Sequence, residues 1–231
     1  MRTLCVDVGG TGIKALVVDD RGEIVSERVR VETPRPATAD AVVEAIVGLA
    51  AGQGTYDRLS VGFPGVVERG VVRTAPNLDD GWTDFPLADR LGERLGVPVR
   101  AANDAGVQGL GVIEGTGTEL VITLGTGMGF GLYIDGRYVP NIELAHHPFR
   151  NRKTYEERVS DAELQRIGVE RWKRRVRKVL AQLRPIFNFR RLYLGGGNAR
   201  LFEPSELPDR VVRVDNVAGL LGGIRLWQDP D

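Results

Sequence analysis

A short apolar strand, a glycine-rich turn and an apolar return strand occur twice in this chain, once near the N-terminus and once near the middle. The first copy predicts strands at 3–8 and 15–18, on either side of a glycine turn. The second copy predicts strands at 119–125 and 130–134, on either side of a second glycine turn. Because helical periodicity follows each copy, the chain is expected to fold into two topologically similar α/β halves.

The composition excludes several classes of protein. An apolar content of 42% with 27% charged residues is typical of a soluble globular chain. Lysine plus arginine and aspartate plus glutamate both number 31, so the whole molecule has no net field to attract nucleic acid or an anionic membrane. The single cysteine, Cys5, permits neither a disulfide framework nor a cysteine-based zinc site. No signal peptide opens the chain and no apolar run approaches the about 20 residues of a membrane helix. We therefore expect a cytoplasmic protein with no membrane or nucleic-acid partner.

The first glycine turn is a candidate phosphate-binding loop. Gly9, Gly10 and Thr11 present backbone N–H groups with little side-chain bulk, and such a nest favours phosphate oxygens. A Rossmann unit needs a helix after the glycines and a Walker loop needs Gly-Lys-Ser/Thr, and neither pattern is present. The turn can equally be an ordinary β-hairpin. Asp7, which ends the preceding strand, would either lie near a bound Mg²⁺ through water or cap the turn.

The second glycine turn strengthens the phosphate interpretation. It contains Gly125, Thr126 and Gly127 in the equivalent place of the second half. Two hairpins that face each other across a cleft can clamp a polyphosphate between their N–H groups. The sequence therefore predicts two phosphate loops, one from each half.

Asp104 is the candidate general base. It follows Asn103 at the end of an apolar strand, and ligand crevices of α/β proteins usually lie at the carboxyl ends of strands. Phosphoryl transfer to a hydroxyl requires positioning, charge stabilisation and a carboxylate that accepts the hydroxyl proton. The local sequence also allows Asp104 to be the N-cap of the segment that follows, so both roles stay open at this point.

Glu143 and His146 lie in a polar, loop-like segment that also contains His147. The chain has two histidines and one cysteine, which are too few ligands for a zinc site here. The carboxylate and the imidazole can instead form hydrogen bonds with sugar hydroxyls. A solvated loop with no binding role is the alternative.

The segment 166–191 is strongly basic, with ten arginines or lysines against one acid, Glu170. An apolar stripe that follows a capping box at 160–163 and extends to Pro185 predicts a long helix there. An anionic chain such as polyphosphate could dock on this helix. A solvated outer face is the commoner cause of a charge run, and we favour that interpretation.

Seven short motifs follow one another along the chain. They are Asp7-Val8-Gly9-Gly10-Thr11, Gly62-Phe63-Pro64-Gly65, Pro76-Asn77-Leu78, Asn103-Asp104, Leu124-Gly125-Thr126-Gly127-Met128-Gly129, Glu143-Leu144-Ala145-His146 and Leu194-Gly195-Gly196-Gly197. Their order and spacing resemble the ROK family of sugar kinases and repressors over nearly the whole chain. The resemblance implies a two-domain, actin-like (ribonuclease-H-like) α/β fold. Residues 1–103 would form a small N-terminal domain onto which a C-terminal helix at 217–231 packs back, and residues 104–216 would form a larger C-terminal domain.

The resemblance also implies roles for single residues. Asp104 is the expected catalytic base, in a reaction in which the sugar 6-hydroxyl attacks a terminal phosphoryl group in line, assisted by Mg²⁺ that lies near Asp7 through water. The expected sugar ligands are Asn77, Gly65, Asn103, Glu143 and His146. The expected phosphate or nucleotide ligands are Gly9, Gly10, Thr11, Lys14, Gly125, Thr126, Gly127, Gly195, Gly196 and Gly197. The family further implies a homodimer.

Two departures from the family pattern affect these expectations. Ala145 replaces the glycine of the usual Glu-x-Gly-His motif, and its methyl group puts the local pocket geometry in question. The cysteine-rich zinc loop that often follows this histidine is absent, so we expect no structural zinc. In this respect the chain is similar to the zinc-free branch that includes polyphosphate glucokinases. No helix-turn-helix precedes the first strand, which argues against the DNA-binding repressor branch.

These observations predict a sugar kinase that transfers a phosphoryl group from polyphosphate, ATP or both to the 6-hydroxyl of glucose. Two alternatives stay open. One is a kinase for another hexose, such as mannose or an N-acetylhexosamine. The other is a sugar-binding protein that has lost turnover, for which Ala145 provides an argument. Net neutrality counts against a third class, nucleic-acid binding through the basic helix.

Overall fold

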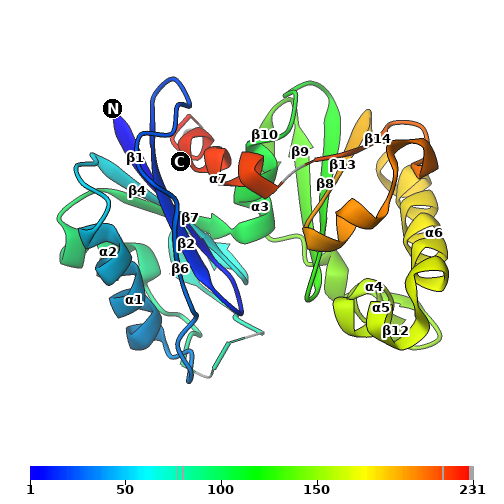
Figure 1. The fold of residues 1–231 in the computed structure, drawn as a ribbon, viewed down its shortest axis with the longest axis horizontal. Helices are drawn as coiled ribbons and strands as arrows, with labels where there is room; N and C mark the ends of the chain where they lie inside the picture. The colour runs from blue at the N-terminus through cyan, green and yellow to red at the C-terminus, as the bar shows by residue number, and fades with distance from the viewer. Residues whose placement is uncertain (77, 80, 215, 229–231) are drawn as a thin grey trace. The chain divides into compact units, whose positions relative to one another are not determined.

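The computed structural model describes residues 1–76, 78–79, 81–214 and 216–228, with the backbone alone for 216–220 (Figure 1). The chain forms two compact units. Unit 1 contains Met1–Gly111 and Val217–Asp231, and unit 2 contains Val112–Asn216. Among the described residues, no helix combines the length and the apolar character that crossing a membrane requires.

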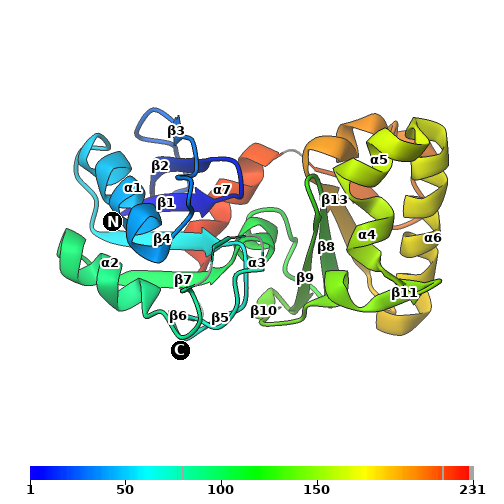
Figure 2. The ribbon, with the colours of Figure 1, turned by 90° about the horizontal axis from the view of Figure 1, so that it is seen from below.

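Unit 1 is built on a five-stranded mixed sheet with the order β3-β2-β1-β4-β7 (Figures 1 and 2). The strands are β1 Arg2–Val8, β2 Ile13–Asp19, β3 Val29–Val31, β4 Arg58–Phe63 and β7 Val99–Asn103. The first three form an antiparallel meander, whereas β1, β4 and β7 are parallel. The register pairs Asp7 with Gly62 and Gly62 with Ala102. The carboxyl ends of three parallel strands therefore meet at one edge of the sheet.

Alternation along β1 divides the core of unit 1 into two layers. Leu4, Val6 and Val8 belong to the layer that includes α1 and α2, and Cys5 belongs to the opposite layer with Ile224 of α7. Figure 2 shows these helices around the sheet. The helices are α1 Ala39–Ala51, α2 Leu87–Leu95, α3 Asp104–Leu110 and α7 Asn216–Arg225, and a small hairpin joins β5 Val67–Glu68 to β6 Val71–Val72.

Close backbone contacts hold α7 against the rest of unit 1. A methyl group added at Gly223 would lie 2.7 Å from Cys5 Sγ, and one added at Gly222 would lie 1.8 Å from a carbonyl oxygen of α3. Ser60 Oγ donates a hydrogen bond of 2.6 Å to the Gly223 carbonyl oxygen. Burial raises the pKa of the Cys5 thiol to about 12, so this thiol is protonated at neutral pH.

Unit 2 repeats the topology of unit 1. Its five-stranded sheet has the order β10-β9-β8-β13-β14, again an antiparallel meander followed by two parallel strands. The strands are β8 Thr118–Leu124, β9 Met128–Ile134, β10 Arg137–Val139, β13 Arg191–Gly195 and β14 Val211–Arg213. The second strand–turn–strand pattern of the sequence thus marks a second copy of the same sheet.

Three helices cover one face of the unit 2 sheet (Figure 2). They are α4 Tyr155–Val159, α5 Asp161–Ile167 and α6 Val169–Phe187. Their apolar side chains pack on Leu120, Ile122 and Leu124 of β8. The remaining elements are β11 Pro148–Arg150, β12 Lys153–Thr154 and the 3₁₀ turns η1 Leu144–His146, η2 Gly197–Leu201 and η3 Pro204–Glu206.

The long helix that the sequence predicts before Pro185 is two helices in the structure. Gly168 separates α5 from α6 with φ 77° and ψ 159°, a conformation that no helix contains and that glycine adopts without a side-chain clash. Helix α6 also continues past Pro185 to Phe187. Because Pro185 lies in the last turn, its missing N–H removes a single bond near the frayed end of the helix.

Candidate active site

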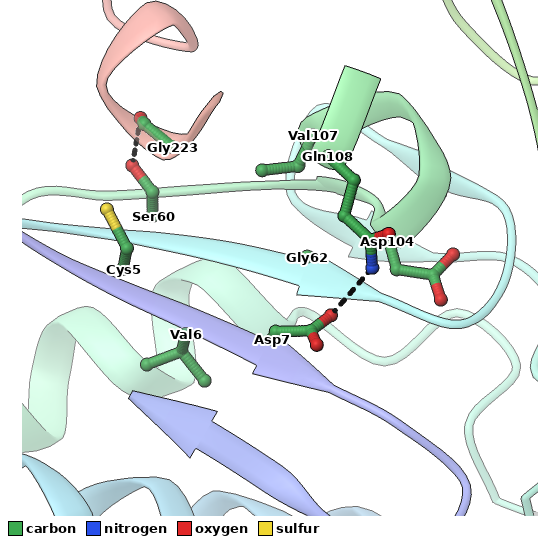
Figure 3. Close-up of a pocket in the computed structure, with 9 residues that line it drawn as sticks. All are labelled: Cys5, Val6, Asp7, Ser60, Gly62, Asp104, Val107, Gln108 and Gly223. Carbon is green, nitrogen blue, oxygen red and sulfur yellow. Dashed lines mark hydrogen bonds between the residues drawn. The ribbon is translucent and has the colours of Figure 1, made fainter. Parts of the chain in front are cut away.

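The carboxylate of Asp7 lies at the carboxyl end of β1, between two hydrogen-bond donors, Lys14 and Gln108, of which Figure 3 shows Gln108. Lys14, its cross-strand partner on β2, donates from Nζ to Oδ2 at 3.0 Å. Gln108 of α3 donates from Nε2 to Oδ1 at 3.2 Å. Only 9% of Asp7 is exposed, and a carboxylate buried to this extent needs such partners to stay charged. The arrangement presents one carboxylate in a fixed orientation at the sheet edge.

Asp104 is the first residue of α3, directly after β7. Asn103 is the N-cap of this helix, because its Oδ1 accepts a hydrogen bond of 3.1 Å from the Gly106 N–H. The Asp104 Oδ1 accepts a hydrogen bond of 2.7 Å from the Ala105 N–H, and the residue is half-buried. The capping role that the sequence left open for Asp104 therefore belongs to Asn103.

Asp7, Gln108 and Asp104 line one pocket of unit 1 (Figure 3). A Cβ at Gly62 would lie 3.3 Å from the Asp104 Cα, so the absence of a side chain there lets α3 begin close to β4. The other lining residues are Cys5, Val6, Ser60, Val107 and Gly223.

The glycine turn between β1 and β2 is a tight hairpin with an exposed tip. The Gly9 N–H donates to the Gly12 carbonyl oxygen at 3.0 Å. Gly10 and Thr11 are exposed, and their N–H groups have no hydrogen-bond partner among the residues that the structure describes. Arg30 Nη2 donates to the Thr11 carbonyl oxygen at 3.0 Å. The tip thus combines available N–H donors with a nearby guanidinium, which suits an anion.

Two functional candidates in unit 1 escaped the sequence analysis. Arg30 on β3 is the cross-strand partner of Lys14 on β2. The pairing of these strands in the predicted meander could therefore have indicated a second positively charged side chain beside the turn. Gln108 lies four residues after Asp104 in the same helix. Residues at this spacing share a helix face, which was the available signal for Gln108.

The second glycine turn, between β8 and β9, is fixed by helices of unit 2. The Gly125 N–H donates to the Gly127 carbonyl oxygen at 3.0 Å, and the Asp161 N–H donates to the Gly125 carbonyl oxygen at 2.9 Å. Glu156 Oε2 accepts a hydrogen bond of 3.1 Å from the Met128 N–H. Thr126 is exposed at the tip. The helices therefore contact this turn at Gly125 and Met128 and leave Thr126, at the tip, accessible.

The glycine run after β13 lies directly against the start of the second turn. Gly196 has φ 86° and ψ 163°, and a Cβ there would lie 2.3 Å from the Leu124 carbonyl oxygen. Gly195 ends β13, and Gly197 begins η2. The structure thus brings the predicted nucleotide-side turn and the second phosphate loop together within unit 2.

Gly196→Ala is expected to lower the stability of unit 2 by about 3 kcal/mol or more, because it adds both backbone strain and a clash with Leu124. Gly197→Ala is the matched control, since a Cβ there meets no atom within 4 Å. Urea unfolding of both variants tests the prediction. Equal unfolding midpoints for the two would contradict the requirement for glycine at 196.

Glu143 and His146 lie at the two ends of one short turn of unit 2. Glu143 Oε2 and His146 Nε2 are 3.5 Å apart. Burial raises the pKa of the Glu143 carboxyl, while the neighbouring His146 opposes this shift. Between them, Ala145 has an ordinary 3₁₀ backbone and buries its methyl group in the core of the unit, with 5% exposed. The alanine that replaces the family glycine is therefore accommodated without a positive φ.

Of the remaining predicted sugar ligands, Gly65 and Asn103 are in contact. Asn103 Nδ2 donates to the Gly65 carbonyl oxygen at 3.1 Å. Glycine is required at 65, because a Cβ there would lie 2.0 Å from the Thr74 carbonyl oxygen. Asn77 lies outside the described residues.

The carboxylate of Asp7 fits a magnesium ion better than it fits zinc. Among the described residues, no group of three or more His, Cys, Asp or Glu side chains is close enough to hold a metal. Mg²⁺ needs one or two carboxylates and otherwise keeps water or binds substrate phosphates. Asp7, which lines the pocket together with Asp104, is the residue of unit 1 that would hold this ion.

Six of the ten cations of the basic segment 166–191 form ion pairs with three acids of unit 2. Glu163 pairs with Arg166 and Arg175, Glu206 with Lys173 and Arg177, and Glu114 with Arg190 and Arg191. Within the described part of the chain, three cations of the segment are exposed and have no partner, namely Arg171, Arg174 and Lys178. Each of the three acids is shared by two cations, so the ion pairs give most of these cations a structural role while the segment keeps a net positive charge.

Comparisons with known proteins agree with this architecture. The sequence model of the ROK family matches residues 3–140. The chain is 32% identical to a polyphosphate glucokinase of Mycobacterium tuberculosis over 94% of this chain and 88% of that protein. A glucokinase of Streptomyces coelicolor is 36% identical over 58% of this chain and 44% of its own length. The chain therefore belongs to the ROK family.

Two solved structures are similar over nearly the whole chain. The inorganic polyphosphate/ATP-glucomannokinase from Arthrobacter sp. strain KM has a TM-score of 0.87 and 32% identity, with 99% of each chain covered. A ROK family glucokinase from Streptomyces griseus, in complex with glucose and AMPPNP, has a TM-score of 0.83 and 26% identity, with 99% of this chain and 100% of that chain covered. These matches confirm the actin-like α/β fold that the sequence predicts.

Proposed function

We propose that this ROK family member is a sugar kinase that transfers a phosphoryl group from polyphosphate, ATP or both to the 6-hydroxyl of glucose. The observation that carries the proposal is the pocket of unit 1, which Asp104 and Asp7 both line at the carboxyl ends of the parallel strands β1, β4 and β7. Phosphoryl transfer to an alcohol needs a proton acceptor and a charge-neutralising centre for the phosphates. The two carboxylates can divide these tasks.

Asp104 is proposed to accept the proton of the attacking sugar hydroxyl. Its carboxylate is held at the start of α3 by a hydrogen bond from the Ala105 N–H, which fixes the position of the proton acceptor. Asp7 is proposed to hold Mg²⁺ through water, and the bound ion supplies positive charge to the phosphates during transfer. Lys14 and the exposed N–H groups of Gly10 and Thr11 offer further donors to phosphate oxygens.

Unit 2 is proposed to contribute the remaining ligands. The turn 125–127, whose Thr126 tip is exposed, and the adjoining run 195–197 are proposed to bind a phosphate chain or a nucleotide. Glu143 and His146 are proposed to bind sugar hydroxyls, and the same role is proposed separately for Asn103, Gly65 and Asn77 of unit 1. Both the Nδ2 and the Oδ1 atoms of Asn103 already form hydrogen bonds with the backbone. We therefore propose that Asn103 shapes the pocket in addition to binding the sugar.

The choice of donor and sugar rests on the relatives. The Mycobacterium protein is named a polyphosphate glucokinase, and the Arthrobacter structure is described as a polyphosphate/ATP-glucomannokinase. The Streptomyces griseus structure contains glucose and AMPPNP. Glucose is therefore the first candidate acceptor, mannose is the second, and both donors stay in the proposal. The paired charges of α6 give no separate argument for polyphosphate.

A matrix of donors and sugars tests the proposal. We expect purified protein with Mg²⁺ to phosphorylate glucose with ATP, polyphosphate or both, and to act more slowly on mannose, N-acetylglucosamine and N-acetylmannosamine. The measurement is sugar phosphate formation under each pair of substrates. Glucose binding by calorimetry without phosphorylation by either donor would identify a sugar-binding protein instead. Faster turnover of another hexose would replace glucose as the substrate.

A further inference from the structure

Gln108 connects the two carboxylates of the unit 1 pocket. It lies one helical turn after Asp104 on α3, and both residues line the pocket (Figure 3). Its amide crosses to β1 and donates to Asp7 Oδ1 at 3.2 Å. A side chain on the helix that begins with Asp104 therefore fixes the orientation of Asp7, which is 101 residues away in the sequence.

The chemistry of this bond suits a carboxylate that must remain available to a cation. A carboxylate has about four lone-pair positions, and Lys14 and Gln108 each occupy one, on different oxygens. The remaining positions can accept hydrogen bonds from water of a hydrated ion. Gln108 orients the group without adding a second positive charge that would compete with the ion.

We propose that Gln108 is a positioning residue that holds the Asp7 carboxylate in place for a divalent cation and ties it to the helix that carries Asp104. The inference rests on the proposed function for the role of Asp7. It assigns a task to a residue that does not contact the reacting atoms. Loss of the Gln108 amide should weaken divalent cation binding while the fold remains intact.

Gln53 provides a matched control in the same unit. Its amide also joins separate segments, because Nε2 donates to the Glu27 carbonyl oxygen at 3.3 Å and Oε1 accepts from Ser26 Oγ at 2.5 Å. Gln53 is buried, with 6% exposed, and it is not among the residues that line the pocket. Gln53→Met therefore removes a structural amide of the same chemistry away from Asp7.

The test measures protein-bound Mn²⁺ by water-proton relaxation, with imidotriphosphate and, separately, with AMPPNP as non-hydrolysable donors. We expect Gln108→Met to weaken Mn²⁺ binding about tenfold, as loss of an outer-shell hydrogen bond does at metal sites. Gln53→Met should stay within about twofold of wild type, because its amide lies outside the pocket. In an Asp7→Asn background, Gln108→Met should add less than about twofold, because the two residues act as one unit.

Wild-type affinity in Gln108→Met, an equal loss in Gln53→Met, or a full tenfold loss on the Asp7→Asn background would each overturn the proposal. So would a wild type that binds no Mn²⁺ with either donor. If Gln108→Met fails to fold, Gln108→Asn takes its place, since it keeps an amide that is one methylene too short to reach Asp7. Because no turnover is needed, a failed kinase assay beside intact Mn²⁺ coupling would reject the proposed function alone.

Discussion

Asp104→Asn is expected to lower kcat by about 10²–10⁴-fold, the usual contribution of a general base. Asparagine has nearly the same shape and keeps an oxygen that can accept the hydrogen bond from the Ala105 N–H. The start of α3 should therefore remain folded, and the substitution removes chiefly the ability to take a proton. The measurement is steady-state kinetics with the best donor and sugar from the matrix, alongside thermal unfolding.

Asp89→Asn is the control for this prediction. Asp89 is an exposed acid in the first turn of α2, so its replacement removes the same charge from the start of a helix in the same unit. Its kcat should match that of wild type. Near wild-type turnover in Asp104→Asn would show that Asp104 does not act as the base. Loss of sugar binding alone, with kcat preserved, would move Asp104 to a binding role.

The fold class was predictable because its signals are local. The strand at 3–8 and the return strand at 15–18 lie within β1 Arg2–Val8 and β2 Ile13–Asp19. The glycine turn between them recurs as the β8–β9 turn, and the sheet that contains it has the same strand order. Apolar alternation and glycine turns depend on neighbouring residues, so one sequence is enough to reveal them.

The helix break at Gly168 was less accessible to sequence analysis. Glycine within an apolar stripe is often tolerated in a helix, and only the observed φ of 77° shows that α5 and α6 are separate.

The acidic partners of the basic segment 166–191 could not be predicted from the sequence for another reason. Glu206 lies 33 residues after Lys173, and Glu114 lies 76 residues before Arg190, so the neutralising ion pairs exist only in the folded chain.

The residues of the candidate site also differ in whether the sequence alone could reveal them. Asp7, Asp104 and the glycine turns carry their own motifs, whereas Gln108 gains its importance from a contact with a distant strand. The two turns also differ in ways that their similar sequences do not reveal. The unit 1 turn has Lys14 and Arg30 beside it, while the unit 2 turn is fixed by the carboxylate of Glu156. One repeated topology therefore supports two different electrostatic environments.

Glu119→Gln is expected to lower the stability of unit 2 by about 3 kcal/mol, the largest stability loss that we predict for a nearly isosteric change. Glu119 is fully buried, and its carboxylate accepts four hydrogen bonds. Three come from the backbone N–H groups of Glu114, Gly115 and Thr116, and the fourth comes from the Tyr193 hydroxyl at 2.7 Å. An amide replaces one acceptor oxygen with an NH₂ group, which faces donors and leaves them without a partner.

Urea unfolding measures the global loss, and amide hydrogen exchange at residues 114–116 measures the local one. Tyr193→Phe removes one of the four donors and should cost about 1 kcal/mol, since the carboxylate keeps its three backbone bonds. Glu114→Gln changes an exposed carboxylate that pairs with Arg190 and Arg191, and such surface pairs contribute little to stability because solvent screens them. The loss at Glu119 should therefore exceed both. If Glu119→Gln unfolds at the same urea concentration as Glu114→Gln, the buried carboxylate is not what holds the 114–116 loop to the sheet.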